Sequence, residues 1–197
     1  MPLQGGDVKV HLLAAAVLGM AMTQGGGQEF RLGGPVLDFT VRDMKDQAST
    51  FSTGKGQVIV VMFFSTRCPM SNAFNYRRNL LYNDFKDRVK FIAVDTNANE
   101  SLEEVRTYAS EVGFDFPVYK DVNNEIADRF GVKATTENFV IDASGFMRYH
   151  GYVEDAVNPS RTARQGLRQA IGEVLHGKPV TLAETGSRGC AIRQTRP

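Results

Sequence analysis

The chain has 197 residues, of which 42% are hydrophobic and 23% charged, and its formal net charge is +1. This length and composition are those of one globular domain with tails. The nearly neutral charge gives no reason to expect nucleic acid or an anionic membrane as a partner. The two cysteines, Cys68 and Cys190, are too few for a disulfide-stapled scaffold, and together with three scattered histidines they offer no zinc-binding spacing.

The first segment with a recognisable pattern is apolar and lies near the N-terminus. Residues 11–22 read HLLAAAVLGMAM, which has the length of the apolar region of a signal peptide and is too short to cross a bilayer. Residues 1–23 are therefore expected to be a signal peptide, followed by a glycine-rich linker over 24–34. The alternative is a cytosolic protein with a frayed N-terminal helix, because Lys9 is the only basic side chain ahead of the run.

After residue 35, strand and helix patterns alternate. Residues 57–64, QVIVVMFF, form a continuous β-branched and aromatic run, which is typical of a strand buried on both faces of a sheet. Ser101 and Glu104 form a capping box that opens a helix. In chain order, we expect strands at 35–43, 48–53 and 57–64, a helix at 70–86, a strand at 89–96, a helix at 101–112, a strand at 116–121, a helix at 123–131, a hairpin at 138–153 and a helix at 159–176.

This order of elements indicates an α/β fold with a central mixed sheet flanked by helices, in one domain over residues 35–177. The helix expected at 70–86 would be continuous, with Arg77 and Arg78 largely off its apolar face. Residues 178–197 have no clear period and are expected to form an extended C-terminal tail on the surface.

Cys68 lies where the buried strand gives way to a helix. The unpaired N–H groups and the dipole of a helix N-terminus favour a thiolate over a thiol, so this position lowers the pKa of a cysteine. Pro69 suits the first helical turn because it has no N–H to leave unpaired, and Arg67 is an adjacent positive charge. The pattern favours a reactive thiol at Cys68, and the alternative is a buried cysteine that only packs.

Several stretches resemble a known family. The sequence FFSTRCPMS after a hydrophobic strand looks like the active-site turn of thioredoxin-fold proteins, and FIAVDTNANES and FPVYKDVNNEIADRFGVKATTENFVIDASGFMRYHG are similar to the peroxiredoxin-like branch of the alkyl hydroperoxide reductase and thiol-specific antioxidant superfamily. GCAIR, which contains Cys190, resembles a C-terminal Gly-Cys-x-Ile-Lys/Arg motif of bacterial members. The resemblance implies a thioredoxin-like redoxin domain that uses Cys68 as its nucleophile and needs no cofactor or metal.

The same resemblance assigns roles around Cys68. Ser65 and Ser71 would help to hold the thiolate, and Thr136, in the place of the usual cis-proline, would border the substrate. Thr66, Arg67 and Pro69 would complete the active-site turn. A cis peptide bond before a residue other than proline costs about 2.5–4 kcal/mol, so the Thr135–Thr136 peptide is expected to be trans.

The sequence also departs from the patterns of this superfamily. Cys68-Pro69-Met70-Ser71 lacks the second cysteine of Cys-x-x-Cys and cannot close a local disulfide. Val61 occupies the position at which peroxiredoxins resemble each other by carrying a proline. No arginine precedes the strand at 138, where it would polarise a peroxide. Cys190 is the one other cysteine in the chain that could resolve an oxidised Cys68, and an unpaired Cys190 is the alternative.

Two functions remain in view. The first is a thiol-dependent oxidoreductase or antioxidant, peroxiredoxin-like protein that acts on a peroxide or disulfide substrate, with an unidentified thiol as electron donor. The second is a non-catalytic thioredoxin-fold module that binds a partner or senses oxidation. Copper handling is disfavoured, because the second cysteine of Cys-x-x-x-Cys is absent. The expected location is outside the cytoplasm, periplasmic or extracellular, if residues 1–23 are a signal peptide and cytoplasmic otherwise, without integral membrane insertion.

Overall fold

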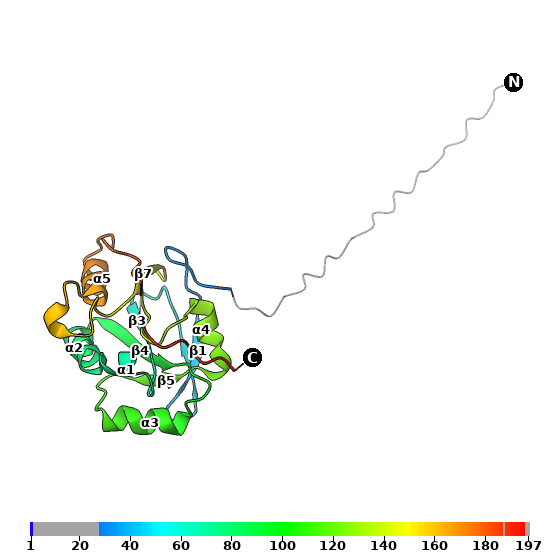
Figure 1. Ribbon diagram of the computed structural model, residues 1–197. Helices are drawn as coiled ribbons and strands as arrows, with labels where there is room; N and C mark the ends of the chain where they lie inside the picture. Colours follow the sequence, from blue (N-terminus) through cyan, green and yellow to red (C-terminus); the bar gives the residue numbers. More distant parts are fainter. Residues whose placement is uncertain (2–27, 187, 196–197) are drawn as a thin grey trace.

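The computed structural model describes residues 1, 28–186 and 188–195, and this part of the chain forms one seven-stranded sheet with helices packed around it (Figure 1). The predicted signal peptide and most of the linker lie outside the described residues. The strands are β1 Phe39–Asp43, β2 Ala48–Phe51, β3 Val58–Phe64, β4 Val89–Asp95, β5 Val118–Lys120, β6 Asn138–Ile141 and β7 Met147–Gly151.

The sheet is mixed, as the alternation of strands and helices predicted. Its order is β2-β1-β5-β4-β3-β6-β7, with β3, β4 and β5 parallel to one another. The hairpin β6–β7 adds two antiparallel strands beside β3, and β1–β2 closes the other edge. This arrangement places the carboxyl ends of β3 and β4 side by side, at the edge of the sheet where ligands bind in open α/β folds.

The central strand β3 contributes to both cores of the molecule. All seven of its residues are buried, and alternate side chains enter opposite faces of the sheet. Helix α4, Glu125–Phe130, covers one face. The other face is covered by helices α2, Asn75–Phe85, α3, Leu102–Glu111, and α5, Gly166–Leu175. The remaining helical pieces are α1, Pro69–Asn72, and two short 3-10 turns at Val122–Asn124 and Pro159–Arg161.

Two helices differ from their predicted extents. The helix expected at 70–86 is broken into α1 and α2, because the chain turns at Ala73 and Phe74. The break turns the following residues, so that Arg78, expected largely off the apolar face, is fully buried. The last helix begins at Gly166 instead of Pro159, because the preceding residues bond to Asp155: its backbone N–H donates to the Arg164 carbonyl oxygen, and its carboxylate accepts the Ala163 N–H.

The C-terminal tail is an integral part of the domain. Glu184 forms a bridge with His150 of β7, and Ala191 forms a bridge with Ala134 in the loop before β6. Ile192 is buried in the same core as α4. The red tail in Figure 1 therefore crosses the fold from the α5 side to the α4 side. Within the described residues, no helix has the length and apolar character needed to cross a membrane.

Candidate active site

Cys68 lies at the carboxyl end of β3 and caps the N-terminus of α1. Its backbone is extended, Pro69 follows as the first helical residue, and its sulfur accepts the backbone N–H of Ser71 at 3.5 Å. The thiol is almost completely buried, with 1% of the residue exposed. A sulfur that accepts an N–H at a helix start is stabilised as a thiolate. The strand–cysteine–helix junction read from the sequence is therefore present.

The tail brings Cys190 onto Cys68. The backbone N–H of Cys190 donates to the Cys68 sulfur at 3.3 Å, across 122 positions of sequence. The Cys190 carbonyl oxygen accepts the backbone N–H of Thr135 at 3.0 Å, which fixes the tail at this point. Both cysteines are free thiols, Cys68 buried and Cys190 exposed. The two sulfur-bearing residues are thus neighbours, and only one of them faces solvent.

The surroundings of the two cysteines shift their thiol pKa values in opposite directions. Burial raises the pKa of Cys68, but hydrogen bonds from the Cys190 thiol, the Thr135 hydroxyl and the backbone N–H groups of Ser71 and Cys190 outweigh burial and lower it overall. The pKa of Cys190 is raised, first by its hydrogen bond to Cys68 and then by burial and the negative charge of Cys68. Of the pair, Cys68 is therefore the more acidic thiol and Cys190 the less acidic one.

Thr135, the residue before the expected Thr136, contacts the Cys68 sulfur through its hydroxyl, and Thr136 lines the pocket beside the turn. The Thr135 hydroxyl is buried and has no other hydrogen-bond partner, so it is available to the thiolate. Thr136 instead donates its hydroxyl to the carbonyl oxygen of Arg188 at 2.9 Å and so ties down the tail. No cis peptide bond occurs among the described residues, so the prediction of a trans Thr135–Thr136 bond is confirmed.

The turn before Cys68 is organised by a buried carboxylate, Glu100. Ser65 donates its hydroxyl to Glu100 at 2.5 Å, and Thr66 donates both its backbone N–H and its hydroxyl, at 2.6 and 2.7 Å. The same Ser65 oxygen accepts the backbone N–H groups of Arg67 and Cys68 at 3.2 and 3.1 Å. Ser65 and Thr66 therefore shape the backbone of the turn, and in the described part of the chain neither side chain bonds to the sulfur.

A second carboxyl group lies behind Glu100. Burial raises the pKa of Asp95 well above its usual range, although the neighbouring Lys120 ammonium opposes this. Burial also raises the pKa of Glu100, but hydrogen bonds from Asp95, Ser65 and Thr66 lower it overall. The pKa values of the two neighbouring carboxyl groups are thus shifted in opposite directions, that of Asp95 upward and that of Glu100 downward. Lys120 pairs with Asp95, and Glu100 accepts the hydrogen bonds of the active-site turn, so the buried charges extend from Lys120 to the turn.

Two arginines flank the turn in different ways. Arg67 turns away from the thiol and binds Glu104 of α3 with two hydrogen bonds of 2.7 Å, at an exposed position. Arg78 of α2 is fully buried and donates to the Ser71 carbonyl oxygen at 2.9 Å, to the Ser71 hydroxyl at 3.3 Å and to the Phe63 carbonyl oxygen at 3.3 Å. The Ser71 hydroxyl also accepts the Ser65 N–H at 3.1 Å, which links Arg78 to the turn.

Arg78 is a buried cation to which no described carboxylate is paired. Burial lowers its pKa to about 10, while the negative charges of ionised Tyr108 and Cys68 act in the opposite direction. A desolvated cation is stabilised by a nearby anion. An ionised Cys68 therefore has a counter-charge within the protein, reached through Ser71. Among the described residues, no group of three or more His, Cys, Asp or Glu side chains could hold a metal ion.

Three residues of this site were missed by the sequence analysis: Glu100, Arg78 and Thr135. Glu100 directly precedes the capping box that begins at Ser101, and its position after the β4 strand was the available signal. Arg78 was hidden because a continuous helix would turn it outward. Thr135 was missed because no local pattern says which of the two adjacent threonines before β6 contacts the sulfur.

Comparisons with known proteins agree with this geometry. The model of the AhpC/TSA family matches residues 32–150. A thiol-disulfide oxidoreductase, ResA of Bacillus anthracis, is 27% identical over 143 residues, which cover 70% of this chain and 81% of that protein. ResA of Bacillus subtilis is 28% identical over 122 residues, 61% of this chain and 66% of that protein.

Solved structures show the same fold. A hypothetical protein from Sinorhizobium meliloti 1021 superimposes with a TM-score of 0.76 and 27% identity, over 86% of this chain and 98% of that chain. A putative thiol:disulfide interchange protein DsbE from Chlorobium tepidum superimposes with a TM-score of 0.59 over 76% of this chain and 98% of that chain, at 17% identity, which shows the fold alone. The fold is thus thioredoxin-like, and the chain belongs to the AhpC/TSA family.

Proposed function

We propose that this protein is a thiol–disulfide oxidoreductase whose redox centre is the pair Cys68 and Cys190. The observation that carries the proposal is the 3.3 Å hydrogen bond from the Cys190 N–H to the Cys68 sulfur, which joins residues 122 positions apart. The thiol-disulfide oxidoreductases among the relatives support the same chemistry. Cys190 takes the role of the second cysteine that the sequence Cys68-Pro69-Met70-Ser71 lacks.

In this proposal, the Cys68 thiolate is the nucleophile. It forms a bond to one sulfur of a substrate disulfide, whose S–S bond breaks, and the other half leaves as a thiolate. Cys190, once deprotonated, then attacks the Cys68 sulfur and releases the second half as a thiolate. The substrate gains two electrons, and the protein loses them and holds a Cys68–Cys190 disulfide. Because Cys68 is buried, the tail must lift from it before a disulfide larger than the site can react.

Return to the reduced state depends on the difference in exposure and acidity between Cys68 and Cys190. Thiol–disulfide exchange is faster at an accessible sulfur and with a leaving group of low pKa. Cys190 is the exposed residue, and Cys68 has the lowered pKa. A small thiol or a partner thiol therefore attacks the Cys190 sulfur and expels Cys68 as thiolate. A second equivalent of thiol, or a second thiol of the same donor, then releases Cys190 as a free thiol and leaves the donor as a disulfide.

A peroxide is the alternative oxidant, as in an antioxidant protein. The Cys68 thiolate would attack one peroxide oxygen, the O–O bond would break, and the other oxygen would leave as hydroxide or alkoxide, which gives a sulfenic acid. Condensation of this acid with the Cys190 thiol would form the disulfide and release water. A buried thiol favours an oxidant as small as hydrogen peroxide. The absence of an arginine just before β6 is expected to make this reaction slower than in peroxiredoxins.

The test is to map both cysteines by peptide mass spectrometry after the reduced protein is mixed with one equivalent of hydrogen peroxide or of a small disulfide. We expect a Cys68–Cys190 disulfide to form, and the Cys190→Ser variant to stop at a Cys68 adduct or sulfenic acid. The proposal would be contradicted if no Cys68–Cys190 disulfide formed after prolonged exposure to either oxidant. That outcome would favour the non-catalytic binding or sensing module.

We also propose that the protein is exported after removal of residues 1–23. The apolar run at 11–22 supports this, and a disulfide centre persists in an oxidising compartment. The intact mass of the mature protein would decide the point, since retention of the full-length mass in cells would contradict cleavage.

A further inference from the structure

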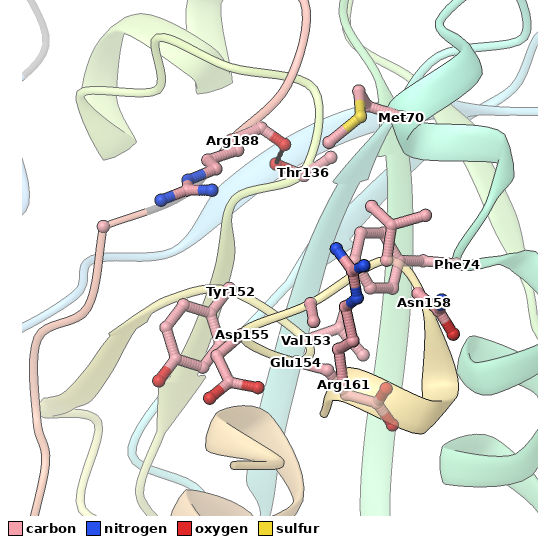
Figure 2. A pocket seen from close by; sticks show the side chains of 13 residues that line it. Met70, Phe74, Thr136, Tyr152, Val153, Glu154, Asp155, Asn158, Arg161 and Arg188 are labelled. Carbon is pink, nitrogen blue, oxygen red and sulfur yellow. Dashed lines mark hydrogen bonds between the residues drawn. The ribbon is translucent and has the colours of Figure 1, made fainter. Parts of the chain in front are cut away.

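A pocket of about 740 Å³ lies between the active-site turn, the C-terminal tail and the loop that follows β7 (Figure 2). One wall is formed by Met70, two residues after Cys68, and another by Arg188, two residues before Cys190. The remaining wall is the loop that follows β7, residues 152–161. The pocket is therefore framed by the active-site turn, the tail that covers Cys68 and one loop, and residues two positions from each cysteine line it, although the cysteines themselves do not.

The lining of the pocket combines an apolar side with positive charge. Met70, Phe74 and Val153 supply apolar surface. Figure 2 shows the guanidinium groups of Arg161 and Arg188 on opposite sides of the open space. Both side chains belong to exposed residues, and neither is ion-paired with a carboxylate in the described part of the chain.

The carboxylates in the lining leave this positive charge in excess. Glu154 is neutralised by Arg77, whose guanidinium lies 2.9 Å away, and both side chains are largely buried. The Glu154 carboxylate also accepts hydrogen bonds of 3.1 Å from Thr162 and Gln165. Asp155 accepts the Ala163 N–H at 3.0 Å and is the one lining carboxylate without an arginine partner. Two arginines therefore face one uncompensated carboxylate.

We propose that this pocket binds a small disulfide or thiol that carries carboxylate groups, of which glutathione disulfide is the representative. The inference rests on the proposed function and adds the substrate class to it. The volume lies in the range of small-molecule sites, about 300–1,000 Å³. Arg161 and Arg188 would pair with the carboxylates, and the apolar side would contact the rest of the molecule. The exchange itself is the two-step reaction described above, with the substrate disulfide as the electron acceptor.

The first experiment measures binding without redox chemistry. The full-length reduced protein is titrated with S-methylglutathione, which cannot exchange, and followed by NMR or calorimetry. We expect saturable binding that is weakened about 3- to 10-fold by Arg188→Gln or Arg161→Gln and by high salt, as is usual for partly exposed charge pairs. The matched control is Arg106→Gln, which removes an exposed arginine on α3, away from the pocket. Absence of saturable binding, or equal weakening by Arg106→Gln, would overturn the proposal.

The second experiment uses exchange rates. Rate constants for oxidation of the reduced protein are measured with glutathione disulfide and with neutral 2-hydroxyethyl disulfide. For each variant, the rate constant with glutathione disulfide is divided by the rate constant with 2-hydroxyethyl disulfide. This ratio cancels any change in the reactivity of the cysteine thiols themselves. We expect the ratio to fall about 3- to 10-fold in each pocket variant and to stay constant in Arg106→Gln. Preference for a peptide disulfide with acidic flanks over glutathione disulfide would overturn the choice of a small molecule.

The two proposals fail in different ways. If the ratio is constant in all variants while both disulfides still oxidise the Cys68–Cys190 pair, the pocket assignment is wrong and the proposed function stands. If neither disulfide nor hydrogen peroxide oxidises the pair, the proposed function is wrong. The binding of S-methylglutathione then decides the pocket assignment by itself.

Discussion

The active-site turn and the C-terminal tail hold their cysteines in different ways. The turn is built around buried charge: Glu100 accepts hydrogen bonds from Ser65 and Thr66, and Arg78 donates to Ser71. The tail is held through its backbone groups, which bond to β7, to neighbouring loops and to side chains such as Thr136. Examples are the Ile192 N–H to the Lys133 carbonyl oxygen at 3.1 Å and the Thr185 N–H to the His150 carbonyl oxygen at 3.0 Å.

This difference assigns different behaviour to the two cysteines. Loss of one partner in a buried charged network is costly, so the turn is expected to keep its shape throughout the reaction. The tail can release a few hydrogen bonds at low cost, since local opening takes less free energy than global unfolding. Between Thr185 and Cys190, the hydrogen bond from Thr136 to the Arg188 carbonyl oxygen is its described attachment. We therefore expect Cys68 to be the fixed partner and Cys190 the mobile one.

The largest expected effect comes from the cysteines themselves. Cys68→Ser should lower the rate of disulfide exchange by more than about 100-fold, because a serine hydroxyl is not ionised near neutral pH. The folded structure should be retained, since sulfur and oxygen occupy similar space. The measurement is the oxidation rate with a small disulfide, with circular dichroism as the control for folding. A Cys68→Ser variant that exchanges at the wild-type rate would show that Cys190 acts alone.

The turn is tested next, by Glu100→Gln. The amide would present an NH₂ group to donors that now face a carboxylate oxygen, so a buried N–H of the turn would lose its acceptor. We expect a loss of about 3 kcal/mol in the free energy of unfolding, measured in urea. Glu103→Gln, at an exposed position of α3, is the matched control and should change stability by less than about 0.5 kcal/mol. Similar losses in both variants would contradict a special role for Glu100.

The anchoring of the tail is tested by Ile192→Ala. Ile192 is 9% exposed and packs in the core on the α4 side. Its truncation should cost about 2 kcal/mol of stability. In a Cys190→Ser background it should also speed alkylation of Cys68 by a bulky reagent, because the tail would open more often. The control is Leu182→Ala, which truncates an exposed side chain of the same tail. Unchanged alkylation despite lower stability would mean that the tail does not shield Cys68.

The smallest expected effect concerns the charge behind the thiolate. Arg78→Met removes a buried cation, so the pKa of Cys68 should rise and its thiolate fraction near neutral pH should fall. We expect alkylation of Cys68 by iodoacetamide, in the Cys190→Ser background, to slow by up to about tenfold near neutral pH and to recover at alkaline pH. Arg78→Lys keeps a positive charge, so its alkylation rate should lie between those of the parent and Arg78→Met. Arg106→Met is the surface control. A pH profile identical to the parent would exclude Arg78 as the counter-charge.

The sequence by itself determined the strand and helix order, because the buried run at 57–64, the capping box at Ser101 and the glycine that ends α4 are local signals. Gly131, for example, has φ +65°, a left-handed conformation that favours glycine. The same locality placed Cys68 at a helix start, where backbone N–H groups meet the sulfur. It also allowed the trans bond before Thr136 to be predicted from the cost of a cis bond alone.

Only the tertiary structure decided what surrounds that sulfur. Cys190, Glu100 and Arg78 approach the turn from the tail, from the loop after β4 and from α2, and no periodicity relates positions so far apart. The break between α1 and α2 turned Arg78 inward, and the loop before β6 brought the Thr135 hydroxyl to the sulfur while Thr136 lines the neighbouring pocket. The physical reason is that helix and strand patterns come from neighbouring residues, whereas the acidity and exposure of a thiol depend on every group folded against it.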